Sequence, residues 1–144
     1  MQTDVNAPVV PLEYTIGQLH SLTVLLPILI FTAVLICDLI HTFGKPKALV
    51  IGHWLVILGL LACMPAILTG LEAAQHYRPE SELLENHRWL GFATGISCSL
   101  YAGLRISTML WKLPISKKWY LVMSVLLLAL VTWTSDVGIL LSSR

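Results

Sequence analysis

Charged residues are scarce in this sequence. Asp, Glu, Lys and Arg together make up 12% of the 144 residues, against 56% apolar residues and a mean hydropathy of +0.79. Soluble domains carry about 25% charged residues, so the composition excludes an ordinary soluble fold. We therefore predict an integral membrane protein whose main partner is the lipid bilayer.

Several other features are missing. The three cysteines, Cys37, Cys63 and Cys98, have no CxxC spacing, so we expect neither a disulfide nor a zinc site. No glycine-rich phosphate loop and no nucleophile beside a base is present, so no catalytic residue is assigned. A net charge of +1 argues against nucleic-acid binding. Residues 1–14 lack Lys and Arg, so we expect the first helix to be retained rather than cleaved as a signal peptide.

What the sequence does contain is four long apolar runs. A bilayer core about 30 Å thick needs about 20 apolar residues per helical span. The expected spans are 15–42, 48–74, 88–111 and 119–141, and Ser81 and Asn86 are alternative caps for the third helix. Short connections favour one all-α domain over residues 1–144, an up-down-up-down four-helix bundle with its first and third spans parallel.

Basic residues set the expected orientation. Lysines gather in the first and third loops, at Lys45, Lys47, Lys112, Lys117 and Lys118. Because short cytoplasmic loops are enriched in Lys and Arg, we expect these loops in the cytoplasm and both termini outside. The expected location is the bacterial inner membrane.

Two histidines stand at the outer ends of apolar runs, His20 in the first and His87 in the third. Ionisable residues at membrane depth are costly and are read as functional candidates. Parallel helices would bring these two to a similar depth, where both could bind one metal. His76 is a reserve ligand, and Gln18, Thr94 and Thr134 are candidate hydrogen-bond donors around the site. The sequence leaves the roles of His41 and His53 open.

Small residues follow His87 on one helical face, at Gly91, Thr94, Gly95, Cys98 and Ala102. Two interpretations stay open. The stripe can let helices pack closely, as Gly-xxx-Gly steps do in membranes, with no cofactor present. Alternatively, a flat ligand lies where side chains are missing. A porphyrin needs such a face and an axial imidazole from each side, so this interpretation gives haem b bound by His20, His87, Gly91, Thr94 and Gly95.

Asp38 and Arg105 follow the two histidines at equal intervals. Each lies 18 residues, or five helical turns, after its histidine. Each helix should therefore carry a histidine and a charge on the same face. Because a charge at membrane depth needs an opposite partner, we predict a structural ion pair between Asp38 and Arg105, close in depth to His41 and His53.

Short motifs resemble the bacterial membrane family called domain of unknown function 2231. Leu19-His20-Ser21, leading to Pro27-Ile28, is similar to that family's Leu-His-Pro start. His87 matches the histidine that opens its third helix. Two further elements are similar to an Ala-x-x-Thr-Gly ending and a Thr-Gly-His-x-Gly-Gly element, at Pro65-Ala66-Ile67-Leu68-Thr69-Gly70 and Thr134-Ser135-Asp136-Val137-Gly138. Ser21, Leu25 and Asp136 stand where the family often has a proline and two histidines.

The resemblance implies membrane electron transfer, because family members occur fused to cytochrome c-like or dehydrogenase-like domains. We expect a cytochrome b-like subunit with haem near the periplasmic face, between the first and third helices. It would pass electrons between the quinone pool and a periplasmic cytochrome c or dehydrogenase. The alternative is a haem-free anchor or assembly subunit that holds a periplasmic partner complex.

Overall fold

The computed structural model describes residues 12–76 and 81–142, which form four α-helices. They are α1 Leu12–Thr42, α2 Pro46–His76, α3 Glu82–Trp111 and α4 Lys117–Ser142. The described residues contain no strand, so the all-α prediction is confirmed. Each helix contains its predicted span. Ser81 is the cap that α3 uses, and its side chain accepts a hydrogen bond from the Leu84 backbone at 3.2 Å.

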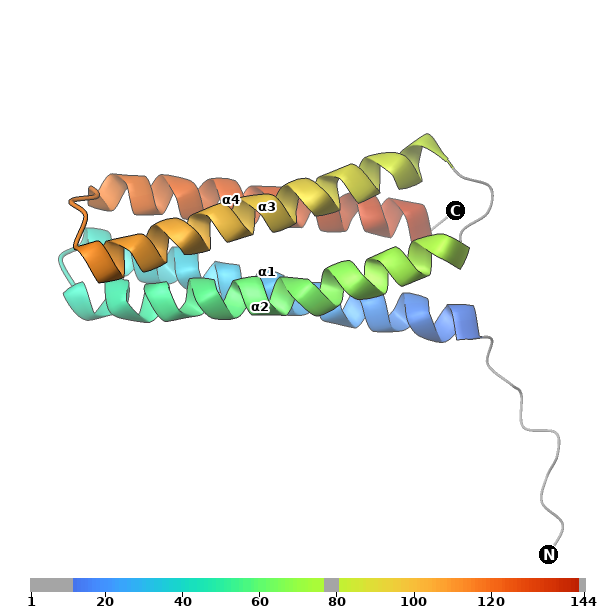
Figure 1. Cartoon of the computed structure of the whole chain (residues 1–144), viewed down its shortest axis with the longest axis horizontal. Helices are drawn as coiled ribbons and strands as arrows, with labels where there is room; N and C mark the ends of the chain where they lie inside the picture. Colours follow the sequence, from blue (N-terminus) through green and yellow to red (C-terminus); the bar gives the residue numbers. More distant parts are fainter. Residues whose placement is uncertain (1–11, 77–80, 143–144) are drawn as a thin grey trace, which may run out of the picture.

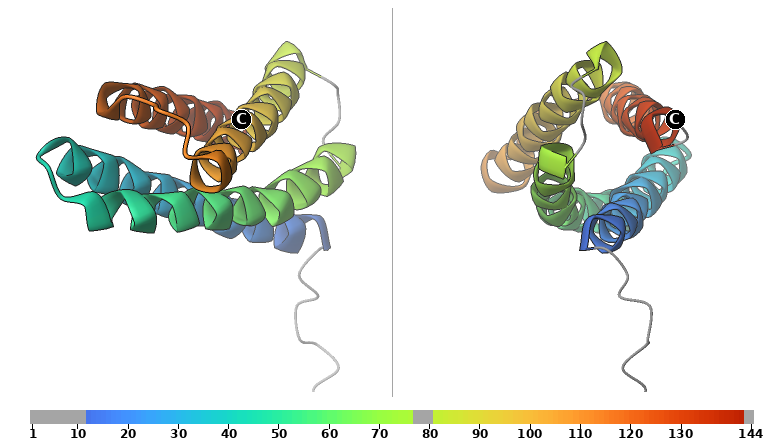
Figure 2. Two further views of the ribbon diagram at one scale, coloured as in Figure 1. Left: turned by 60° about the vertical axis from the view of Figure 1, so that its left-hand side comes forward. Right: turned by 90° about the vertical axis from the view of Figure 1, so that its right-hand side faces the viewer.

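The helices form a ring in the order α1, α2, α3, α4 (Figure 2). Consecutive helices run in opposite directions (Figure 1). α1 packs on α2 and α4, and α3 packs on the same two, so α1 and α3 face each other across the diagonal. The end with the α1–α2 and α3–α4 loops carries the five exposed lysines and is called the lysine end. The other, where His20 and His87 lie, is called the histidine end.

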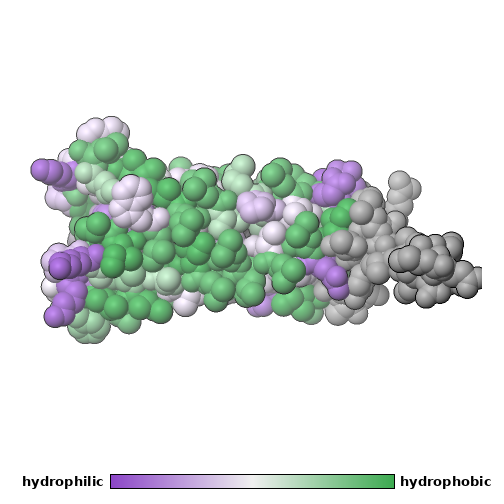
Figure 3. Space-filling model, turned by 90° about the horizontal axis from the view of Figure 1, so that it is seen from below, coloured by the Kyte–Doolittle hydropathy of each residue, from purple (hydrophilic) through white to green (hydrophobic). Residues whose placement is uncertain are grey.

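The face of the bundle shown in Figure 3 is apolar along its middle, with hydrophilic residues toward its ends. Leu22, Trp89 and Leu100 are large apolar side chains between 67% and 70% exposed. Exposed apolar surface on this scale marks a contact with protein or membrane. By length and composition, three helical segments could cross a membrane: Ile16–Thr42, Pro46–Gln75 and Lys117–Leu141. α3 is equally long but is the least apolar of the four helices, so the fourth predicted crossing stays a prediction.

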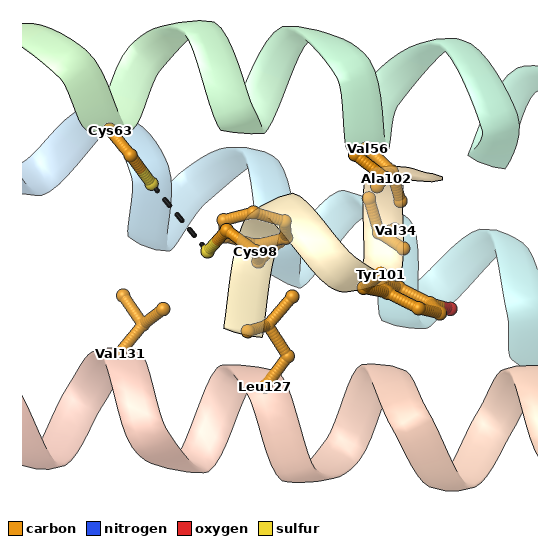
Figure 4. Packing of buried hydrophobic residues seen from close by; sticks show 9 residues of the cluster. Val34, Val56, Cys63, Cys98, Tyr101, Ala102, Leu127 and Val131 are labelled. Atoms are coloured by element: carbon orange, nitrogen blue, oxygen red, sulfur yellow. Dashed lines mark hydrogen bonds between the residues drawn. The ribbon is translucent and has the colours of Figure 1, made fainter. Parts of the chain in front are cut away.

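A buried cluster joins all four helices near the middle of the bundle (Figure 4). Its members are Phe31, Val34, Val56, Cys63, Cys98, Tyr101, Ala102, Leu127 and Val131. The sulfurs of Cys63 and Cys98 lie 3.7 Å apart within it. These two and Cys37 are free thiols. The two buried thiols therefore serve as small core side chains.

Gly59→Ala is expected to destabilise the packing of α1 on α2. A Cβ at position 59 would lie 2.8 Å from Cζ of Phe31, whose side chain is 1% exposed and has little room to move. Overpacking of this kind costs about 1–3 kcal/mol. The measurement is the melting temperature in detergent, followed by circular dichroism. Gly103→Ala is the control, because its added Cβ meets nothing within 4 Å; equal melting temperatures for the two variants would contradict the prediction.

Candidate functional site

The imidazoles of His20 and His87 meet across the diagonal of the bundle. Their ring centroids lie 6.1 Å apart, with the ring planes at 80° to each other. Both side chains are half-buried. α1 supplies one ring and α3 the other, at the histidine end. The structure thus brings together the two histidines that the sequence analysis singled out.

The hydrogen bond of His87 fixes its tautomer. Its Nδ1 lies 3.1 Å from the backbone oxygen of Thr134 on α4. A carbonyl oxygen only accepts, so Nδ1 carries the proton and donates it. In the neutral ring, Nε2 is then the unprotonated nitrogen, with a lone pair available to a metal.

His20 is held in the same way by α2. The hydroxyl of Thr69 donates to the backbone oxygen of Pro65 at 2.8 Å, which uses its single proton. With that proton used, its oxygen accepts from Nδ1 of His20, 3.2 Å away, and the backbone oxygen of Ala66 is a second acceptor for this imidazole. The Nε2 atom of His20 is again left unprotonated. Both imidazoles thus have their Nδ1 atoms engaged by a neighbouring helix.

Glycines lie directly beside both rings. A Cβ on Gly70 would stand 2.8 Å from Cε1 of His20, and one on Gly138 would stand 2.9 Å from Cε1 of His87. Any larger residue at either position would displace the imidazole. The sequence analysis did not assign these glycines or Thr69 a role. The clue to them in the sequence was their position in two motif elements that resemble the family, Thr69-Gly70 and Thr134 to Gly138.

Two cavities adjoin the histidine pair. The inner cavity, of about 100 Å³, is lined by both histidines and by Gly91, Thr94 and Gly95, the three stripe residues that were predicted to bind haem. The end cavity, of about 700 Å³, shares both histidines and opens toward Gln18 and Gly138. The cavities therefore flank the imidazoles on two sides.

The stripe on α3 combines the two interpretations left open by the sequence. A Cβ on Gly95 would lie 3.0 Å from Cδ1 of Ile67, so this position serves close packing on α2. A Cβ on Gly91 would meet nothing within 4 Å. The hydroxyl of Thr94 lies 2.9 Å from that of Thr134, not beside a ring nitrogen. Thr94 therefore bonds to Thr134 and not to either imidazole.

A family model described as "Predicted membrane protein (DUF2231)" matches residues 17–144. The chain belongs to this family. No curated protein and no solved structure matches it. The match spans all four helices, and the apolar surface agrees with it. This DUF2231 protein is a membrane protein with transmembrane helices.

The donor set of this DUF2231 protein restricts which metal group would fit. Among the described residues, no group of three or more His, Cys, Asp or Glu side chains could hold a metal ion. Two imidazoles alone do not complete a tetrahedral zinc site. Iron in a porphyrin lacks only its axial ligands, which two imidazoles can supply. The side chain of His76, the reserve ligand, lies outside the described residues.

A second polar group of the DUF2231 protein lies toward the lysine end. Arg105 donates through Nη2 to Oδ2 of Asp38, and both side chains are fully buried. The hydroxyl of Tyr101 lies 3.2 Å from the same carboxylate oxygen. The guanidinium is held between two rings, with Cζ 4.9 Å from the centroid of Tyr101 and 4.4 Å from that of Tyr120. These cation–π contacts stabilise the charge of the buried Arg105.

Proposed function

We propose that the protein is an integral membrane electron-transfer subunit that binds a b-type haem between α1 and α3, with His20 and His87 as axial ligands. The observation that carries the proposal is the pair of rings 6.1 Å apart, each with its Nδ1 engaged and its Nε2 unprotonated. Metal–nitrogen bonds of about 2 Å on each side suit two rings at this separation.

The space around the rings supports the same group. Cofactor sites usually occupy about 300–1,000 Å³, and the end cavity alone measures about 700 Å³. The end cavity and the inner cavity share five lining residues: His20, Val24, Gly70, His87 and Ser135. At Gly91 there is open space where a side chain would begin. The residues present therefore fit a porphyrin with two imidazole ligands.

The protein's own residues would orient and insulate the group. A bound haem supplies one-electron oxidation and reduction. Thr69 and the Thr134 carbonyl accept the Nδ1 protons, which holds the rings in place and makes the Nε2 atoms better ligands. Val24 and Val131 line the inner cavity with apolar side chains. An apolar shell of this kind would tune the redox potential of a bound haem.

The proposal includes an up-down-up-down insertion in the bacterial inner membrane, with four crossings and both termini on the periplasmic side. The five exposed lysines at the lysine end support a cytoplasmic position for that end. A crossing of α3 is supported by the burial of Thr94, Arg105 and Thr108. The exposed charged residues of this helix, Glu82, Glu85 and Arg88, lie in its first two turns at the histidine end. Its exposed face carries Ile96, Leu100 and Leu110. The histidine pair would then lie near the periplasmic face, between the quinone pool and a periplasmic cytochrome c or dehydrogenase.

The absorption spectrum of the purified full-length protein tests the proposal. After expression in a bacterium with ample haem supply, the sample should show a Soret band that shifts on reduction with dithionite. A folded but colourless sample would contradict the proposal.

A haem-free anchor or assembly subunit for a periplasmic complex is the second candidate. The contact of Ile67 with Gly95 favours it, because part of the small-residue stripe is already used for helix packing. A colourless sample with full helical content, purified together with a periplasmic partner, would support this function.

Thr69→Val is expected to weaken haem binding about 10- to 100-fold, because it removes the hydrogen-bond acceptor of His20 Nδ1 while keeping the side-chain shape. Haem titration into the apoprotein measures the affinity. Thr134→Val is the matched control, because His87 bonds to the backbone oxygen of Thr134 and keeps this partner. Equal losses in the two variants would show that the Thr69 hydroxyl does not support the ligand.

A further inference from the structure

Five buried polar atoms toward the lysine end have no hydrogen-bond partner among the described residues. They are Oδ1 of Asp38, Nδ1 of His41, Nδ1 of His53, and Nε and Nη1 of Arg105. The four residues come from α1, α2 and α3. Leaving such groups unpaired in the interior destabilises the folded state. Buried polar groups in native proteins are satisfied by protein or by ordered water, so this cluster calls for a ligand.

Gly52 on α2 leaves space beside two of these atoms. The position where its side chain would begin lies 3.4 Å from Nη1 of Arg105 and 3.5 Å from Oδ1 of Asp38. An unpaired donor and an unpaired acceptor therefore border the same small gap. His53, the next residue, packs on Tyr120, the ring that also contacts the Arg105 guanidinium. The unpaired groups thus belong to one cluster.

The chemistry of the cluster selects a neutral ligand that both donates and accepts. Arg105 and Asp38 balance each other's charge, so an added anion would meet the carboxylate and an added cation the guanidinium. The cavities at the histidine end do not include Asp38, His53 or Arg105. A buried water makes about three hydrogen bonds, which suits the unpaired donor and the unpaired acceptor beside Gly52.

We propose that water binds in this gap and bridges Oδ1 of Asp38 to Nη1 of Arg105 and to Nδ1 of His53. The site is a hydrated pocket inside a membrane-embedded helix bundle. Chains of carboxylates and imidazoles within membranes serve as proton relays. His41, whose Nδ1 belongs to the cluster, is in the last turn of α1, next to the exposed α1–α2 loop. The site therefore gives the lysine end a place to take up a proton, whether or not haem is bound at the histidine end.

X-ray hydroxyl-radical footprinting of the full-length protein in lipid nanodiscs tests the proposal, because radicals form from bound water and oxidise adjacent side chains. His53 and Phe31 are 6% and 1% exposed, so bulk solvent reaches neither. After correction for intrinsic reactivity, His53 should be oxidised several-fold faster than Phe31. Equal rates in the unaltered protein would overturn the proposal without any variant.

The Gly52→Ala variant provides a second test of the proposed water site. Its methyl group would make ordinary van der Waals contacts with Arg105 and Asp38, so the fold should persist while the gap is filled. Oxidation of His53 should then fall to the level of Phe31. Gly103→Ala, whose added Cβ meets nothing within 4 Å, should leave the labelling unchanged. Persistent labelling of His53 in a folded Gly52→Ala protein would also overturn the proposal.

Discussion

His20→Ala and His87→Ala are each expected to abolish the low-spin haem spectrum of the purified protein. Each change removes one of the two axial ligands while leaving the other ring and its Nδ1 partner in place. A porphyrin iron with a single imidazole is five-coordinate or takes up water, and its Soret band broadens, shifts or disappears as haem is lost. The spectra of oxidised and dithionite-reduced samples, with haem content per chain, provide the measurement.

His53→Gln is the matched control for these variants. His53 is also a buried helical histidine, but it packs on Tyr120, with ring centroids 5.9 Å apart, away from the ligand pair. Its replacement should leave the Soret band unchanged. Normal spectra from both ligand variants would eliminate His20 and His87 as ligands.

Imidazole rescue separates ligation from folding. His87 lines both cavities, so truncation to Ala leaves a hole that adjoins about 700 Å³ of existing space. Added imidazole should enter this hole and restore the low-spin spectrum of His87→Ala. Failure of rescue in a sample that retains haem would argue that the side chain acts structurally.

The spacing of polar residues in the sequence was enough to predict which helix faces meet. The apolar runs gave the four helices, and the interval of 18 residues from His20 to Asp38 and from His87 to Arg105 placed a histidine and a charge on one face of each helix. Helical periodicity is local and regular, so it can be recognised in the sequence without knowledge of the three-dimensional fold. The ion pair of Asp38 with Arg105 is present in the structure.

The residues that hold His20, His87 and Arg105 in place could not be predicted from helical periodicity. Thr69 and Gly70 reach His20 from another helix, and Gly138 reaches His87 from α4. Tyr101 and Tyr120 enclose Arg105 from two helices. Such contacts depend on the rotation and offset of neighbouring helices, which side-chain packing sets and which no local pattern encodes. The family resemblance contained Thr69, Gly70 and Gly138 but gave them no partners.

The same limit applies to the stripe on α3. Gly91 and Gly95 are one helical turn apart and look equivalent in the sequence. In the structure one faces open space and the other contacts Ile67. A difference of this kind arises from the tilt of α3 against α2, so the sequence could state both interpretations of the stripe but not divide it between them.

Asp38→Ala is expected to destabilise the bundle by about 3–5 kcal/mol, the usual cost of removing one partner from a buried ion pair. Arg105 would keep its full charge at 0% exposure, and two of its nitrogens already lack protein partners. The free energy of unfolding in mixed micelles, measured by titration with a denaturing detergent, provides the test. Asp136→Ala is the control, because this carboxylate is exposed and its removal should change stability by less than about 0.5 kcal/mol.

The double variant Asp38→Leu/Arg105→Met measures how much the ion pair contributes to the stability of the bundle. Replacing a buried ion pair by apolar side chains of similar volume is often neutral or stabilising by about 1–4 kcal/mol. The double variant should therefore recover most of the stability that Asp38→Ala loses, and the Tyr101 and Tyr120 rings can pack on Met in place of the guanidinium. Full recovery would mean that Asp38 and Arg105 are not required for folding, which fits a site kept for water and protons. A double variant as unstable as Asp38→Ala would instead show that the charged network itself holds α1 and α3 together at the lysine end.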